Sequence, residues 1–301
     1  MKTLTFNCKI ISPLRMAGAH KNLELRETEI KGLMRFWWRA CNPTFSIMDL
    51  KKNEAEIFGG SYKLVSAANE KLVSKKSSFS IHISNLSATR GARSIAFLPH
   101  KGNGRNNELD SYERGDFIVE FRFRDTAHYE NVKNIFILST ILGGFGLRAR
   151  RGFSSIQITQ INNIDFNHPN NLQSIFSILK TVSTNHSFNS VKIFTKSEKL
   201  LAKFPYIDEI YLANNFKNSV VKSLLHQISS FTSGLLDNEN GKKLGGRKFA
   251  APVYVSLIEL DNEFIPILTK LNSKWKWKLE ETIFKEENQN TFINKFLKKT
   301  N

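Results

Sequence analysis

Apolar and polar residues follow two different periods along the chain, and each period predicts its own kind of element. Residues Thr3 to Ile11 alternate between apolar and polar side chains, which indicates a β-strand. Residues Ile30 to Cys41 repeat apolar side chains every three or four positions, as an amphipathic helix does. A further helix is predicted from His128 to Leu142, and alternation returns from Ser155 to Thr159.

The sequence pattern of the rest of the chain divides it into two halves. Asparagine-rich residues after Ile161 suggest a boundary, so we predict domains at 1–163 and 164–301. A helix, a basic glycine-containing loop and a strand occur in this order in both halves, ~100 residues apart, which favours two similar α+β domains over one large sheet. Any two α+β domains would also give this order by chance. The other predicted elements are helix Met48–Ile57, strands Phe79–Ser84 and Asp116–Arg124, helix Leu172–Thr181, strands Val191–Thr195 and Ile207–Leu212, helix Phe216–Phe231 and strand Pro252–Ile258, with a polar insertion at Lys101–Asn107.

The loop at 143–153 reads Gly-Gly-Phe-Gly-Leu-Arg-Ala-Arg-Arg-Gly-Phe and contains no acidic residue. Glycine allows a backbone to turn tightly and to approach a ligand closely. Arginine offers a planar fork of donors that suits phosphate oxygens. We therefore expect the loop to hold a polyanion, with Gly143, Gly144, Gly146 and Gly152 forming the turn and Arg148, Arg150, Arg151 and Phe153 contacting the ligand.

Two nucleotide-binding interpretations of this loop are excluded by its context. A phosphate-binding loop of ATPases needs Lys-Ser or Lys-Thr after its last glycine, and here Phe153 and Ser154 follow Gly152. The dinucleotide fingerprint needs a strand before the loop and a helix after it, and the order here is reversed. A simple glycine cap of the preceding helix, with its arginines facing water, stays an alternative.

The charge balance points to an anionic partner. The chain of 301 residues carries 44 Lys and Arg against 27 Asp and Glu, a formal net charge of +17. Such an excess favours nucleic acid or another anionic surface, although part of it, as in Lys51-Lys52, is typical of a solvated surface. No stretch reaches the ~20 apolar residues of a membrane helix. The only cysteines, Cys8 and Cys41, give no zinc or disulfide pattern, so we expect a cytoplasmic protein without a cofactor or metal.

The helix at 30–41 presents a second basic surface. A helical projection places Ile30, Met34 and Trp37 on the apolar face, opposite a basic face that also bears Trp38. An indole among cations can stack on a base or pair with arginine, so we expect Lys31, Arg35, Trp38 and Arg39 to contact RNA. Two alternatives stay open: Trp38 packs into a neighbouring strand or a partner subunit, or the arginines pair with Glu24, Glu27 or Glu29.

Taken together, these segments resemble the RAMP superfamily of CRISPR-associated RNA-binding proteins, and within it the head subunits of type III-B (Cmr) effector complexes. The helix carries the Lys-Gly and Arg-Phe-Trp-Trp-Arg-Ala patterns, and the glycine loop is similar to the RAMP loop except that Ser154 replaces its last glycine. The matching residues are Ser12-Pro13, Ala17-Gly18-Ala19, Glu24-Leu25-Arg26, Ile30–Ala40, Glu54–Gly60, Gly144-Phe145-Gly146, Gly152-Phe153-Ser154 and, less closely, Arg247 with Ala250-Ala251-Pro252.

The resemblance implies two tandem ferredoxin-like (RRM-like) α+β domains. It also implies a non-catalytic subunit that caps one end of the crRNA-bound assembly, contacts crRNA, target RNA and other Cmr subunits, and serves antiviral defence. Arg247 and Lys248, in the second basic glycine loop at 241–248, are further expected RNA contacts.

An enzymatic alternative rests on one histidine. Some RAMP relatives cleave RNA without a metal by using a histidine as general acid or base. Of the seven histidines, His20 alone lies in a loop beside the predicted RNA-binding helix. A crRNA-processing endoribonuclease with His20 as general base is therefore the alternative function. The sequence shows no metal-ligand spacing and no other catalytic constellation.

Overall fold

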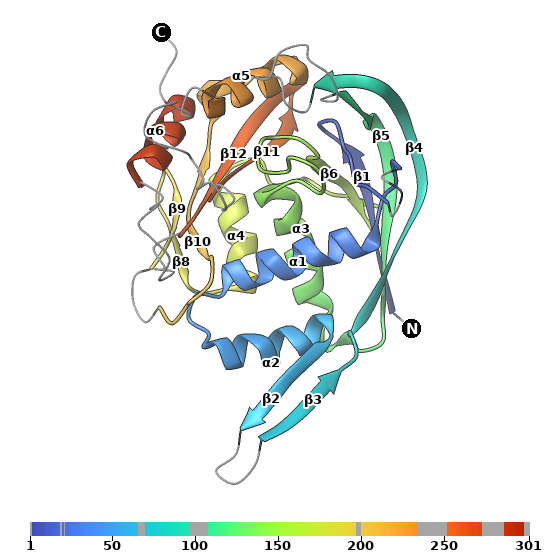
Figure 1. The fold of residues 1–301 in the computed structure, drawn as a ribbon, viewed down its shortest axis with the longest axis vertical. Coiled ribbons are helices and arrows are strands. Elements are labelled where there is room, and N and C mark those ends of the chain that lie inside the picture. The colour runs from blue at the N-terminus through green and yellow to red at the C-terminus, as the bar shows by residue number, and fades with distance from the viewer. Residues whose placement is uncertain are drawn as a thin grey trace.

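The chain forms two five-stranded antiparallel sheets with helices between them (Figure 1). The computed structural model describes residues 2–18, 20, 22–65, 70–96, 108–196, 200–233, 252–272 and 286–297. The strands are Lys2–Ile10 (β1), Gly60–Val65 (β2), Glu70–Lys75 (β3), Phe79–Ala96 (β4), Glu108–Phe123 (β5), Ile156–Ile161 (β6), Ile164–Asp165 (β7), His186–Phe188 (β8), Ile193–Thr195 (β9), Ile207–Leu212 (β10), Val253–Leu260 (β11) and Glu263–Leu271 (β12). The α-helices are Glu27–Cys41 (α1), Ile47–Phe58 (α2), Tyr129–Leu142 (α3), Leu172–Val182 (α4), Val221–Ser233 (α5) and Glu286–Leu297 (α6).

The first sheet has the ferredoxin-like strand order. Its strands run β4-β5-β1-β6-β7, with α1 between β1 and β4 and α3 between β5 and β6. Alternation along β1 buries Leu4, Phe6, Cys8 and Ile10 against the helices and leaves the other face polar. Desolvation by burial raises the pKa of the Cys8 thiol. Both cysteines are buried and free.

The second sheet has the strand arrangement of the first, except that one position is filled by a strand from a different place in the chain. Its order is β11-β12-β10-β9-β8, with α5 between β10 and β11 and α6 after β12. Among the described strands, β9 lies beside β10 in the position that β6 has beside β1 in the first sheet, although β9 precedes β10 in the chain. Strand β7 pairs with β6, so the first sheet extends to Asp165, two residues past the predicted boundary at 163/164, which stays a prediction.

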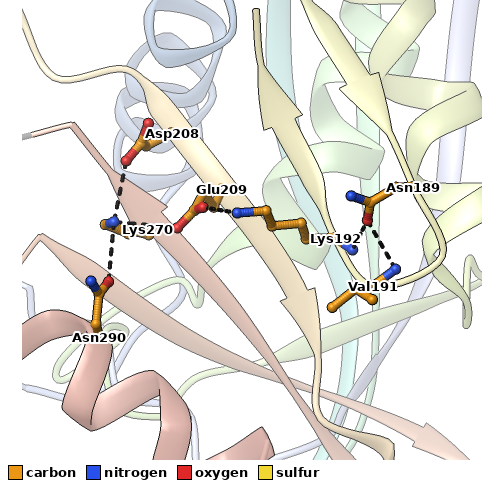
Figure 2. A network of polar contacts seen from close by, with 7 residues as sticks. All are labelled: Asn189, Val191, Lys192, Asp208, Glu209, Lys270 and Asn290. Carbon is orange, nitrogen blue, oxygen red and sulfur yellow. Dashed lines mark hydrogen bonds and ion pairs between the residues drawn. The ribbon is translucent and has the colours of Figure 1, made fainter.

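A network of charged and polar side chains fixes α6 on the second sheet (Figure 2). The buried Lys270 of β12 lies 3.3 Å from the Glu209 carboxylate, 3.4 Å from that of Asp208 and 3.3 Å from the Asn290 amide oxygen of α6. Lys192 contacts the other oxygen of Glu209. Two carboxylates compensate the buried lysine, as a charge inside a protein requires.

The helices between the sheets give the two domains one continuous core. One apolar cluster contains Phe6 and Phe121 of the first sheet, Trp37 of α1, Phe136 of α3 and Ile210 of the second sheet. All of Ile135–Leu142 is buried, which agrees with the long apolar run in the sequence. Within the described ranges, no helix combines the length and the apolarity needed to cross a membrane. The predicted polar insertion at 101–107 lies outside the described residues.

Candidate nucleic-acid interface

The glycine-rich loop joins α3 to β6, as predicted, and its glycines are needed for contacts inside the protein. A Cβ atom on Gly144 would lie 2.3 Å from the Phe153 carbonyl oxygen, and one on Gly146 would lie 2.3 Å from that of Arg15. Gly152 has φ +80°, a conformation that favours glycine. A Cβ on Gly143 would lie 3.0 Å from Trp37. The close approach is therefore to the protein's own backbone at Gly144 and Gly146 and to the Trp37 side chain at Gly143.

The main chain of this loop is occupied by internal hydrogen bonds. The N–H groups of Phe145 and Ser154 donate to Ser154 and Pro13 carbonyls at 2.8 and 3.0 Å. Those of Leu147 and Gly152 donate to Arg15 and Val255 carbonyls, both at 2.8 Å. The prediction of a backbone cradle for a polyanion is therefore wrong for these amides, since each already has an acceptor.

Ser154 shows how the loop accommodates a side chain where the RAMP pattern has glycine. It keeps the left-handed conformation, with φ +58°. Its hydroxyl lies 3.4 Å from the Leu147 carbonyl oxygen and 3.4 Å from the Arg15 N–H, so it links the loop to the segment after β1. Local hydrogen bonding of this kind compensates part of the cost of a positive φ.

Arg151 is buried beneath α6. Its guanidinium donates to the carbonyl oxygens of Arg150 (2.7 Å) and Val253 (3.1 Å) and lies 5.7 Å from the centre of the Phe292 ring. Burial, reinforced by Arg148 and Arg150, lowers the pKa of Arg151 to about 10. The expectation that Arg151 contacts RNA is contradicted, because the side chain is shielded by the second domain.

Two aromatic residues expected at the interface are also buried. Phe153 packs in the core of the second domain, beside Leu225 and Ile228. Trp38 is 3% exposed and packs between Phe45 and Phe58, at ring-centre distances of 6.1 and 6.3 Å. The docking of α2 covers this side of α1. Trp38 therefore packs against a neighbouring part of the same chain, but against a helix and the segment before it rather than against a strand.

Arg150 and Arg148 are the loop arginines that stay half-buried. Arg150 lies 4.8 Å above the Tyr254 ring of β11, and the Tyr254 ring lies 5.7 Å from that of Phe36 on α1, at 32°. Burial lowers the pKa of Arg148. In the described part of the chain, no carboxylate lies within 4.0 Å of either guanidinium. Arg150 therefore brings a cation to the side of α1 that bears Phe36.

A basic stripe on α1 is formed by Lys31, Arg35 and Arg39. Glu54 of α2 accepts from Arg35 at 2.7 Å and from Arg39 at 2.8 Å through the same oxygen. Arg35 and Arg39 therefore pair with Glu54 rather than with Glu24, Glu27 or Glu29. One carboxylate facing two guanidinium groups leaves the stripe cationic.

Lys31 adds a third cation at the end of the stripe. It donates to Ser77 Oγ at 2.7 Å and lies 4.9 Å from the centre of the Phe79 ring. Burial lowers the pKa of Lys31, and the nearby positive charges of Arg35 and Arg124 lower it further. An anion bound at this stripe would relieve that repulsion.

Gly32 lies on α1 between the basic stripe and Phe36. It is exposed, and no atom lies within 4 Å of the position that a Cβ would take. A glycine inside a helix costs about 1 kcal/mol relative to alanine. Because the packing of this chain does not require Gly32, the position leaves room for something that approaches the helix backbone from outside. We call the surface formed by Lys31, Gly32, Arg35, Phe36, Arg39 and Arg150 the α1 surface.

Two of the predicted RNA contacts, Arg247 and Lys248, lie with the whole loop at 241–248 outside the described residues. His20 is exposed in the turn before α1. Across the described ranges, no three His, Cys, Asp or Glu residues are arranged to hold a metal ion.

The two central strands of the first sheet present no aromatic ring on its open face. The residues that β1 and β5 turn away from the helices are Thr3, Thr5, Asn7 and Lys9 on β1 and Asp116, Ile118, Glu120 and Arg122 on β5. Base stacking on a sheet of RRM type requires aromatic side chains there. The α1 surface is therefore the better candidate for nucleic acid.

Four residues of this site were not predicted from the sequence. Glu54 reaches α1 from the next helix, Tyr254 reaches it from β11 of the second sheet, and Phe36 lies on α1 itself. Gly32 carried a local signal, since a glycine in the middle of a strongly amphipathic helix calls for an explanation.

Comparison with known proteins places this geometry in a family. The RAMP superfamily model matches residues 7–157, which is half of the chain. A CRISPR system Cmr subunit, Cmr1-2 of Pyrococcus furiosus, is 25% identical over 177 residues, covering 52% of this chain and 95% of that protein.

Two solved structures share the fold over nearly the whole chain. The crystal structure of Cmr1 from Pyrococcus furiosus in its apo form has a TM-score of 0.62 and 15% identity, covering 98% of this chain and 97% of that one. A chain of the type III-B Cmr-beta complex bound to cognate target RNA has a TM-score of 0.58 and 11% identity, covering 98% of each. The fold is that of Cmr1, with tandem RAMP domains, and the chain belongs to the RAMP superfamily.

Proposed function

We propose that this protein is an RNA-binding subunit of a type III-B CRISPR effector complex. In this role it caps one end of the crRNA-bound assembly and helps to capture target RNA, without cleaving RNA itself. The relative named as a Cmr subunit and the similarity of fold over 98% of the chain support membership of such a complex.

One observation carries the RNA-binding part of the proposal. On the α1 surface, Lys31, Arg35 and Arg39 share α1 with Gly32, Arg150 reaches the Phe36 side of α1 over the Tyr254 ring, and Glu54 is the one carboxylate paired with these cations in the described ranges. Lysine and arginine side chains grouped on one surface neutralise phosphates and make affinity strongly dependent on salt. The half-buried Phe36 ring adds an aromatic contact for an unpaired base.

A salt series with single-stranded RNA tests the assignment. Arg39→Gln and Arg150→Gln should each weaken binding and reduce the slope of log K against log salt by about 0.7 for each phosphate that the variant no longer neutralises. Arg122→Gln is the matched control for Arg39→Gln, because Arg122, like Arg39, pairs with a glutamate and is partly exposed, but it lies on the first sheet. If the control and the two variants lose affinity equally, the α1 surface is not the RNA site.

Membership of the complex is tested separately. The purified protein should assemble with crRNA and the other type III-B subunits of its source. The non-catalytic role predicts that RNA incubated with the protein in EDTA stays intact. Products ending in a 2′,3′-cyclic phosphate that disappear in His20→Ala would instead assign the endoribonuclease activity.

A further inference from the structure

An exposed apolar patch lies on the side of the molecule where α2 begins. Ile47 and Met48, in the first turn of α2, are 44% and 54% exposed, and Leu201 is 57% exposed. The patch is formed by two segments that are about 150 residues apart in sequence. The Pro43 carbonyl oxygen joins them, because it accepts the N–H groups of Leu201 at 3.1 Å and Ala202 at 2.9 Å.

Other contacts keep these two segments in place. Asn185 donates to Thr44 Oγ1 at 3.2 Å, and Ser46 caps α2 by accepting the Asp49 N–H at 3.2 Å. Buried Leu50 and the half-buried Phe45 anchor the same turn to the main core. The exposed side chains therefore project from a fixed backbone rather than from a mobile loop, which is the arrangement of a preorganised contact surface.

Lysines surround the patch. Lys51 and Lys52 follow Ile47 and Met48 by one helical turn, and Lys203 follows Leu201. All three are exposed, and no ion pair with an acid of the described ranges involves them. The acid nearest in sequence, Asp49, accepts a hydrogen bond from the Ser46 hydroxyl at 2.7 Å. An apolar centre with a charged rim is the usual anatomy of a protein interface.

The chemistry of the patch selects a protein as its occupant. Ile47, Met48 and Leu201 are aliphatic and cannot stack on bases, so RNA gains nothing from covering them. A second copy of this chain in a twofold pair would set the lysine rim against itself. We propose that this patch docks a neighbouring protein subunit whose contact surface has an apolar groove with an acidic rim. The inference rests on the proposed function, since that neighbour is a subunit of the effector complex.

The test compares assembly of two double variants with the other subunits and crRNA. Met48→Asp with Leu201→Asp should weaken incorporation at least about tenfold, as truncation of central interface side chains does. Ile164→Asp with Val220→Asp is the matched control, because both side chains are similarly exposed elsewhere, at 72% and 54%. Binding of single-stranded RNA and the Tm should be alike in the two variants.

Four outcomes of the assembly experiment can be distinguished. Loss of incorporation in the patch variant alone supports the proposal. Incorporation of both variants at the wild-type level overturns it while leaving the proposed function intact. A wild-type protein that joins no complex overturns the proposed function and this inference together. A wild-type dimer that the patch variant dissociates assigns the patch to self-association instead.

Discussion

Gly32→Ala should change stability and RNA binding in opposite directions. The new Cβ meets no atom within 4 Å, so nothing in the protein opposes it, and Gly32 has no positive φ that alanine would strain. Replacing a glycine inside a helix by alanine lowers the entropy of the unfolded chain and protects the helix backbone. We expect the free energy of unfolding to rise by about 0.5–1 kcal/mol and the Tm by about 1–3 °C.

The same methyl group should weaken RNA binding, because it occupies the place where a ligand approaches the helix between Arg35 and Phe36. A loss of about 1 kcal/mol corresponds to about a fivefold increase in Kd. Gly32→Leu should increase the loss further while keeping the helix. Ser177→Ala on the exposed face of α4 is the control, since it improves a position on another helix that is not part of the α1 surface and should leave Kd unchanged.

Thermal unfolding and fluorescence anisotropy with labelled single-stranded RNA measure the two effects on the same samples. If Gly32→Ala raises the Tm but binds RNA with the same Kd as the wild type, RNA does not approach the helix at Gly32. If it lowers the Tm, the argument that packing does not require the glycine is wrong.

Three further perturbations test other parts of the account. Glu54→Gln should lower the free energy of unfolding by about 1–3 kcal/mol, because it weakens a buried acceptor of two charged hydrogen bonds. The affinity for RNA should nevertheless rise, because the α1 surface gains net positive charge. A fall in RNA affinity in the folded variant would contradict the electrostatic argument. Gly144→Ala should destabilise the protein by about 1–3 kcal/mol, since its Cβ would collide with the Phe153 carbonyl, and an unchanged denaturation midpoint would disprove that constraint. Burial lowers the pKa of His168 to about 3 and that of His186 to about 4. The unfolded chain therefore binds more protons than the folded one below about pH 6.5, and the free energy of unfolding should fall as the pH drops from about 6.5 toward 4. The pH dependence of urea unfolding should be smaller in His168→Phe, and an unchanged dependence would show that His168 does not contribute.

The sequence predicted the positions of most elements because their hydrophobic periods are local. The helix at 30–41, the strand at 207–212 and the helix–loop–strand order around residue 147 agree with α1, β10 and the α3–β6 connection. Strand β12 was missed, and Pro266 is one reason: a proline argues against a central strand, yet here it lies opposite Leu257 between two partner strands.

The candidate site was harder to predict, because burial depends on elements distant in sequence. Trp38 lies near the edge of the basic face of α1, and only the docking of α2 decides that its indole is covered. Arg151 looks like its neighbour Arg150 in the sequence, but α6, at 286–297, closes over one and not the other. The local pattern gives charge and period, whereas exposure is a property of the tertiary fold.

Photo-crosslinking of 4-thiouridine RNA to the protein, followed by mass spectrometry of the peptides, tests the central claim most directly. The account predicts crosslinks in the segment Glu27–Cys41 and around Arg150, with a yield that falls as salt increases. Crosslinks confined to the outer face of the first sheet, or a yield independent of salt, would contradict it.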